Sequence, residues 1–175
     1  NKREQADLKS SVGGEARRYL RILLVNVEAF ASKKVFQFLE MFTHRSNFLL
    51  AVDESTTIKN IKAKRTKALI KFAEGAKYKR ILTGAPITKS PLDLYSQFLF
   101  MSPKILGFES YWSFQGRYAV IVNRKMGSHQ FNQVVGYKNL EELKKKVDPH
   151  SFRVTKDEAL DLPPKIYTTR QVDLT

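Results

Sequence analysis

Short apolar runs alternate with amphipathic stretches along the chain up to about residue 105. The runs predict β-strands at residues 21–30, 48–52 and 79–84, and the stretches between them predict helices at 32–42, 61–74 and 90–101. Strands that are apolar throughout and separated by helices indicate a parallel sheet with helices on both faces. This part of the chain is therefore predicted to have an α/β fold.

The start of the third predicted helix carries specific signals. Ser90 suits the N-cap, Pro91 suits the first helical position, and Asp93 stands where the acid of a capping box belongs. The residues that follow are apolar on nearly every face. We therefore expect this helix to be well buried.

The pattern changes after residue 106. Aromatic and basic residues mix in FESYWSFQGRYAVIVNRKMG, and NLEELKKKV at 139–147 predicts a charged amphipathic helix. We predict that residues 107–160 form a helical segment in which the rings of Trp112 and Phe114 pack inward. The last stretch, residues 162–175, is predicted to be a strand.

The composition favours a polyanionic partner. Lys and Arg total 31 against 17 Asp and Glu, which gives a net charge of +14. The chain has no apolar run of about 18 residues and begins with the polar sequence NKREQADLKS, so we expect no membrane contact. Cysteine is absent, which excludes disulfides and fits a cytoplasmic protein. The histidines lie far apart, which indicates surface residues and no metal site.

Two adjacent acids, Asp53 and Glu54, follow the predicted strand at 48–52. Ligands of open α/β sheets bind at the carboxyl ends of the strands. Neighbouring residues of a strand point to opposite faces, so two acids that act together must lie where the strand gives way to a loop. An aliphatic run ending in Asp-Glu is also the Walker B pattern of P-loop NTPases. Many buried strands, however, end in an acid that only caps the next helix.

The stretches VDESTTIKN and ILTGAPITKSPLDLYSQFLFMSP resemble motifs II and III of superfamily-two helicases, in the Swi/Snf-like branch and especially in its phage-encoded members. Motif II of that branch reads Asp-Glu-x-x and then Ile/Leu-Lys-Asn, and motif III reads Leu-Thr-Gly-Thr-Pro ahead of a Leu-rich helix. The matching residues are Asp53, Glu54, Ile58, Lys59 and Asn60 in motif II and Leu82, Thr83, Gly84 and Pro86 in motif III. The resemblance runs from about residue 22 to the end and is most specific between 48 and 106.

The resemblance implies a partial RecA-like lobe that uses ATP and Mg²⁺ in the full-length parent. Asp53 would hold Mg²⁺ bound to the nucleotide, and Glu54 would polarise the attacking water. Thr83, Gly84, Ala85 and Pro86 would couple the γ-phosphate to bound DNA. Ala85 replaces the second Thr of the family pattern, so a hydroxyl is missing there. The alternative for these four residues is a simple strand-ending turn.

The resemblance also implies a division of the chain. Residues 1–106 would be the later part of the first lobe, 107–160 a family-specific insertion, and 161–175 the entry to a second lobe. The sequence contains no G-x-x-x-x-G-K-[ST] phosphate loop. We therefore expect that the chain alone does not hydrolyse ATP. Its partners would be double-stranded DNA and the rest of its own chain, in the host cytoplasm if it is phage-encoded.

Basic residues predict where DNA would touch the chain. The candidates for contacts to the phosphate backbone are Lys59, Lys62, Lys64 and Arg65 in the first lobe, Arg117, Arg124 and Lys125 in the insertion, and, by a loose match to the family, Asn26. A solvated helix face explains the first group about equally well.

Two other classes of function stay open at this point. A non-catalytic basic module would bind DNA in a salt-sensitive way, without need of Asp53 and Glu54. A metal-dependent nuclease would use an acid-x-Lys pair such as Glu142 and Lys144, but that pair falls on a predicted helix, whereas a nuclease core needs it on a strand.

Overall fold

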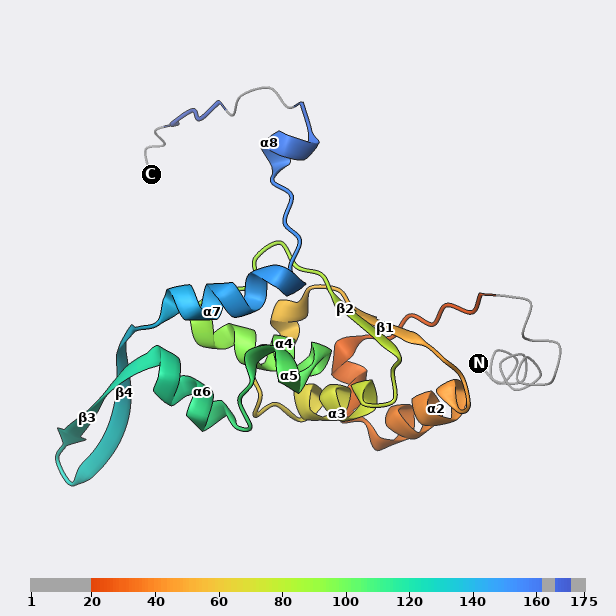
Figure 1. Ribbon diagram of the computed structural model, residues 1–175, viewed down its shortest axis with the longest axis horizontal. Coiled ribbons are helices and arrows are strands. Elements are labelled where there is room, and N and C mark those ends of the chain that lie inside the picture. The colour runs from red at the N-terminus through yellow and green to blue at the C-terminus, as the bar shows by residue number, and fades with distance from the viewer. Residues whose placement is uncertain (1–19, 162–165, 171–175) are drawn as a thin grey trace, which may run out of the picture.

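The computed structural model describes residues 20–161 and 166–170. Figure 1 shows a body of helices around two short strands, from which a β-hairpin projects at one end. The elements of the body are η2 (Val27–Ala31), α2 (Lys33–Thr43), β1 (Leu49–Val52), η3 (Ser55–Ile58), α3 (Lys64–Ala73), β2 (Tyr78–Ile81), η4 (Pro91–Asp93), α4 (Leu94–Met101) and α5 (Pro103–Leu106). They are followed by α6 (Tyr111–Tyr118), β3 (Ala119–Met126), β4 (His129–Tyr137), α7 (Leu140–Val147), η5 (Asp148–His150) and α8 (Lys156–Ala159).

Strands β1 and β2 pair in parallel, in the register Leu49 with Tyr78 and Val52 with Ile81. The sequence prediction of a parallel sheet flanked by helices is therefore confirmed. Helices α2 and α3 lie on one side of the sheet (Figure 1), where Val52 is buried among their apolar side chains. On the opposite face Leu49 and Tyr78 are more than half exposed, so the described helices do not cover both faces as predicted.

The strand predicted at residues 21–30 is wrong. Residues 20–26 are extended without strand pairing, and residues 27–31 form η2, whose N-cap is Asn26. The period-two pattern is real, because Leu23 and Val25 pack on the core while Leu24 is 90% exposed. No strand in the described part of the chain pairs with this segment, and without a partner an extended segment is not a strand.

Helix α4 joins two hydrophobic clusters into one core. Phe100 packs in a cluster around Phe72 of α3, whose ring meets those of three other phenylalanines. Tyr95 packs in a second cluster with Phe114 and Tyr118 of α6. The predicted burial of this helix is confirmed, and so is the capping box formed by Ser90 and Asp93 at its start. α4 therefore fixes the motif-bearing sheet against the segment that follows residue 106.

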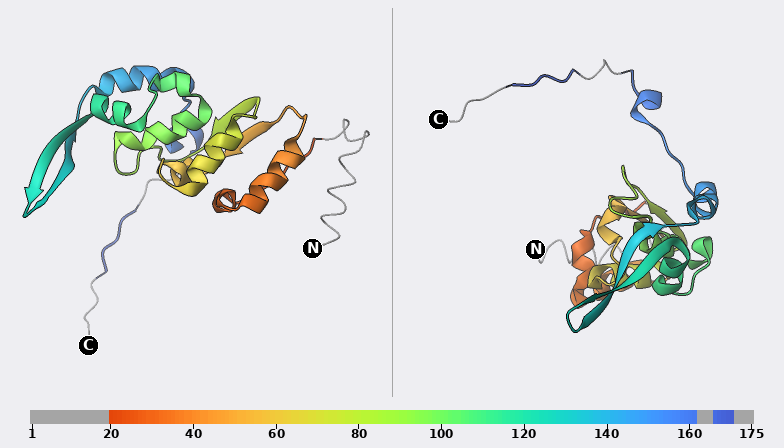
Figure 2. Two further views of the ribbon diagram at one scale, coloured as in Figure 1. Left: turned by 90° about the horizontal axis from the view of Figure 1, so that it is seen from below. Right: turned by 90° about the vertical axis from the view of Figure 1, so that its left-hand side faces the viewer.

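The segment 107–160 is only partly helical. The helix predicted at 139–147 is present as α7, but residues 119–137 form the antiparallel hairpin β3–β4, which the sequence reading missed. The run Ala119–Val122 is dominated by β-branched side chains, which favour a strand. Gly127, with φ 61°, forms the turn. Figure 2 shows the hairpin extending past α6, at the end of the molecule opposite α2.

The predictions for the two ends of the chain are covered only in part by the described residues. Residues 166–170 contain no strand, so the strand predicted at 162–175 is absent where that range is described. Residues 162–165 and 171–175 lie outside the described residues, as do residues 1–19 of the predicted first-lobe segment.

Candidate functional site: two acids at the end of a parallel strand

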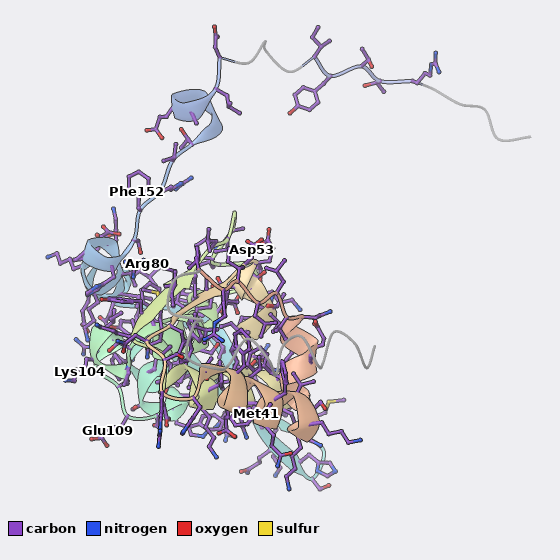
Figure 3. The ribbon with its side chains drawn as sticks, turned by 90° about the vertical axis from the view of Figure 1, so that its right-hand side faces the viewer. Met41, Asp53, Arg80, Lys104, Glu109 and Phe152 are labelled. Atoms are coloured by element: carbon purple, nitrogen blue, oxygen red, sulfur yellow. The ribbon has the colours of Figure 1, made fainter. Side chains whose placement is uncertain are left out.

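Asp53 and Glu54 lie just beyond the carboxyl end of β1, and both are exposed. Figure 3 shows Asp53 at the edge of the body. One carboxylate oxygen of Asp53 accepts a hydrogen bond of 3.0 Å from the backbone N–H of Glu54. Glu54 itself adopts a left-handed conformation, with φ 48° and ψ 57°. The chain thus leaves the strand path between the two acids, as their joint use requires.

The left-handed backbone of Glu54 predicts that glycine at this position gives a more stable protein than alanine does. A residue with a Cβ atom is strained there by about 1 kcal/mol, and glycine is not. Glu54→Gly should therefore be about 1 kcal/mol more stable than Glu54→Ala, the reverse of the order at an ordinary helical position. Urea unfolding of the two variants measures the difference. Both lose the carboxylate, so an alanine variant as stable as the glycine variant contradicts the prediction.

Motif III lies beside motif II. The backbone N–H of Leu82 donates to the carbonyl of Val52 at 2.9 Å, and that of Ser55 donates to the carbonyl of Leu82 at 3.0 Å. The ends of β1 and β2 are thereby tied together. Next in the chain, the Thr83 hydroxyl accepts a hydrogen bond of 3.2 Å from the N–H of Ala85. Thr83 and the exposed Gly84 therefore stand next to the two acids, although their coupling role stays a prediction.

Gln97 is the residue that sequence reasoning missed. Its side chain is fully buried, accepts a hydrogen bond of 2.6 Å from the Ser55 hydroxyl, and donates at 2.8 Å to the carbonyls of Pro86 and Asp93. It therefore connects the turn after the acids, the end of motif III and the start of α4. One residue earlier, the buried Ser96 hydroxyl donates to the carbonyl of Ile58 at 2.7 Å. Two adjacent polar residues in an otherwise apolar helix were the available signal.

The Asp93 carboxylate organises the loop after motif III. One of its oxygens accepts hydrogen bonds from the N–H and hydroxyl of Thr88 and from the N–H groups of Lys89 and Ser90. Burial raises the pKa of Asp93, but these hydrogen bonds together outweigh burial and hold the pKa below its usual value. The Thr88 hydroxyl also accepts a hydrogen bond from the ammonium of Lys59. The acid-bearing segment and the motif III loop are thus linked at a second point.

The predicted basic contacts of the first lobe separate into two kinds. Lys64 is exposed, and the ammonium of Lys62 lies 5.3 Å from the centre of the Trp112 ring. Arg65 instead has structural partners, because its Nε donates to the carbonyl of Thr57 at 3.2 Å and its guanidinium lies 3.7 Å from Glu28. The prediction that Trp112 packs inward is wrong, because its side chain is 66% exposed.

The predicted contacts of the insertion are spread over different elements. Arg117 on α6 forms an ion pair with Glu142 of α7, whose pKa this hydrogen bond lowers. The same carboxylate accepts from the Tyr118 hydroxyl; burial and this hydrogen bond raise the pKa of Tyr118 to about 12.

The other predicted contacts lie elsewhere. Arg124 donates to Gln133 across the hairpin at 3.2 Å, and Lys125 is exposed near the hairpin tip. The Asn26 side chain caps η2 by accepting from the N–H of Glu28 at 3.0 Å. The structure therefore does not gather the eight predicted contacts on one surface.

Comparison with known proteins decides the family. The SNF2-related domain family matches residues 21–175. The chain belongs to this family. A yeast (Saccharomyces cerevisiae) relative, the TATA-binding protein-associated factor MOT1, is 39% identical over 118 residues, which cover 66% of this chain and 6% of the relative. An uncharacterised ATP-dependent helicase of Mycoplasma genitalium is 34% identical over 126 residues, which cover 71% of this chain and 11% of the relative.

The match also sets limits. The chain spans about a tenth or less of the length of these relatives. The human TATA-binding protein-associated factor 172 is similar in the same way, with 37% identity over 66% of this chain and 6% of its own length. No solved structure gives a significant match. A SNF2-related domain has the RecA-like helicase fold, so the fold class expected from the sequence is confirmed.

The exposed acids of this SNF2-related domain fit a magnesium–nucleotide complex. Mg²⁺ is usually held by one or two carboxylates together with substrate phosphates, and it does not need a protein cage. Among the described residues, no group of three or more His, Cys, Asp or Glu side chains that could hold a metal ion is found. Nor is any helix among the described residues long and apolar enough to cross a membrane.

Proposed function

We propose that this chain is part of the first lobe of an ATP-dependent DNA translocase or helicase. Asp53 would bind the Mg²⁺ of ATP, and Glu54 would orient and polarise the attacking water. One observation carries the proposal. The two acids of motif II follow β1 directly, and their chain neighbours Val52 and Ser55 are hydrogen-bonded through the backbone to Leu82, where motif III begins.

The residues of this chain would act by position and charge. When bound, Mg²⁺–ATP would supply the electrophilic phosphorus, and its metal would neutralise charge on the phosphates. Asp53 is pre-oriented by its hydrogen bond from the N–H of Glu54, and Glu54 is turned out of the strand by its left-handed backbone. Thr83 stands beside them at the end of β2. Gln97 is hydrogen-bonded to Ser55 after motif II and to Pro86 of motif III, so a displacement of one motif would be transmitted to the other.

DNA would bind through its phosphates, without sequence readout. Lys59, Lys62 and Lys64 are the first-lobe contacts that we propose, and Arg124 and Lys125 those of the hairpin. We further propose that residues 1–106 belong to the first lobe, 107–160 to an insertion and 161–175 to the entry of a second lobe. The rest of the same chain is then the main protein partner. The phage-type assignment, and with it a host cytoplasm, rests on the sequence resemblance.

The decisive experiment uses the full-length parent. Duplex DNA should stimulate its ATP hydrolysis, and it should displace the third strand of a DNA triplex in an ATP-dependent manner. The 175-residue chain, without a phosphate loop in its sequence, should show no turnover. A parent that binds DNA but neither hydrolyses ATP nor displaces the strand would instead be a DNA-binding module.

The nuclease alternative finds no support in the geometry. Glu142 and Lys144 both lie on α7, and the Glu142 carboxylate is already engaged by Arg117 and Tyr118. DNA cleavage by the parent with Mg²⁺ and without ATP would revive this alternative.

A further inference from the structure

A cleft of about 610 Å³ separates the projecting hairpin from the body of the domain. Its wall on the body side is the segment Lys59–Lys62 with the start of η4, and its wall on the insertion side is α6 with the inward face of the hairpin. The cleft shares no residue with the acid pair, but its first lining residue, Lys59, directly follows η3. The cleft is therefore lined in part by the last residues of motif II, Lys59 and Asn60.

The chemistry of the cleft combines an exposed ring with free positive charge. Trp112 is 66% exposed, which is unusual for the largest apolar side chain. Tyr111 supports the ring edge-on, with 5.7 Å between ring centres. Among the side chains that the structure describes, no carboxylate lies within ion-pair distance of the ammonium groups of Lys59 and Lys62; Lys59 bonds a hydroxyl, and Lys62 lies over the ring.

The remaining polar groups of the cleft are Ser90 and three amides, of which Asn60 and Asn132 each have one hydrogen bond to their Oδ1 atom from the N–H of Lys62 and the amide of Asn123. Asn60, Gln115 and Asn132 line it, and such side chains can donate to and accept from the edge of a base. The one acid, Asp93, already accepts four hydrogen bonds from its own loop. The lining thus offers a stacking surface, amide groups and positive charge, which match a base and its phosphate.

We propose that this cleft binds an unstacked nucleotide of single-stranded DNA. The base lies on Trp112 in the place now taken by the Lys62 ammonium, and that ammonium moves to the neighbouring phosphate. Lys59 binds the next phosphate along the strand. Lys59 and Lys62 are also proposed contacts to duplex DNA, so duplex and single strand compete for these two lysines, and only the single strand places a base on Trp112. Binding in the cleft does not depend on ATP hydrolysis. A base inside an intact duplex cannot reach it.

The test uses the fact that Trp112 is the single tryptophan of the chain. An oligodeoxythymidine of about 12 nucleotides should quench its fluorescence on titration, and an abasic oligonucleotide of the same length should bind about tenfold more weakly without quenching. A duplex of the same length should bind without quenching. Equal affinity for the two single strands, or equal quenching by the duplex or by poly-glutamate, overturns the proposal.

Variants distinguish contacts to the base from contacts to the phosphate. Binding is followed by the fluorescence anisotropy of labelled DNA. Trp112→Leu should remove the preference for the thymidine strand over the abasic one, and its exposed position makes unfolding no concern. Lys62→Gln should weaken the binding of both the thymidine strand and the abasic strand. Lys104→Gln removes an exposed lysine outside the cleft lining and should leave the affinity for both strands unchanged. A Trp112→Leu variant that keeps the full base preference contradicts the assignment, whatever the ATPase activity of the parent.

Discussion

Glu54→Gln in the full-length parent should lower DNA-stimulated ATP turnover by about 10²- to 10⁴-fold, the usual contribution of a group that polarises or deprotonates the attacking water. Glutamine keeps the shape of the side chain but cannot take up a proton. Glu54 is exposed, and its carboxylate accepts no hydrogen bond within the part of the chain that the structure describes, so folding should be unaffected. Steady-state ATP hydrolysis at saturating duplex measures the effect.

Two further variants make this result specific. Glu109→Gln, at an exposed glutamate before α6, removes the same charge far along the chain and should leave turnover unchanged. Asp53→Asn should raise the KM for Mg²⁺–ATP as well, because it weakens the proposed metal contact. Binding of a fluorescent ATP analogue should survive Glu54→Gln. A Glu54→Gln parent that turns over within a few fold of the original would remove Glu54 from the proposed chemistry.

The parts of the fold that could be predicted are those with a local cause. The strand that ends at Val52 is an apolar run closed by an acid, and the strand that ends at Ile81 is marked by the Thr-Gly turn that follows it, so both were found within three residues. The start of α4 was found because a capping box is a signal within four residues. The position of the acid pair followed from the strand end, since only a loop lets two neighbours act together.

The parts that could not be predicted depend on distant neighbours. Residues 21–26 have the right pattern for a strand, but pairing is decided by what lies alongside. The hairpin β3–β4 was hidden by the aromatic-basic texture before it, although its β-branched run was a local signal. The exposure of Trp112 depends on which face of α6 meets the core, and Phe114 and Tyr118 take that face.

Gln97→Leu should destabilise the chain by about 3 kcal/mol, the largest effect that we expect on folding from a single polar side chain. Leucine has a similar volume, so the core stays filled. It leaves the buried Ser55 hydroxyl without its acceptor and the carbonyls of Pro86 and Asp93 without this donor. Urea unfolding measures the change. Gln37→Leu makes the same substitution at an exposed position of α2 and should shift stability by less than about 0.5 kcal/mol.

A double-mutant cycle distinguishes a connection from mere burial. Ser55→Ala should cost about 1 kcal/mol alone, but much less in the Gln97→Leu background, because the hydroxyl it removes then has no acceptor. Additive effects would show that the 2.6 Å hydrogen bond contributes nothing specific. Coupled effects would show that the Gln97 amide on α4 connects the turn after the acids to the end of motif III.

The full-length Gln97→Leu parent should then keep most of its basal ATP turnover but lose much of the stimulation of turnover by DNA, because the link between the two motifs is lost while both acids remain.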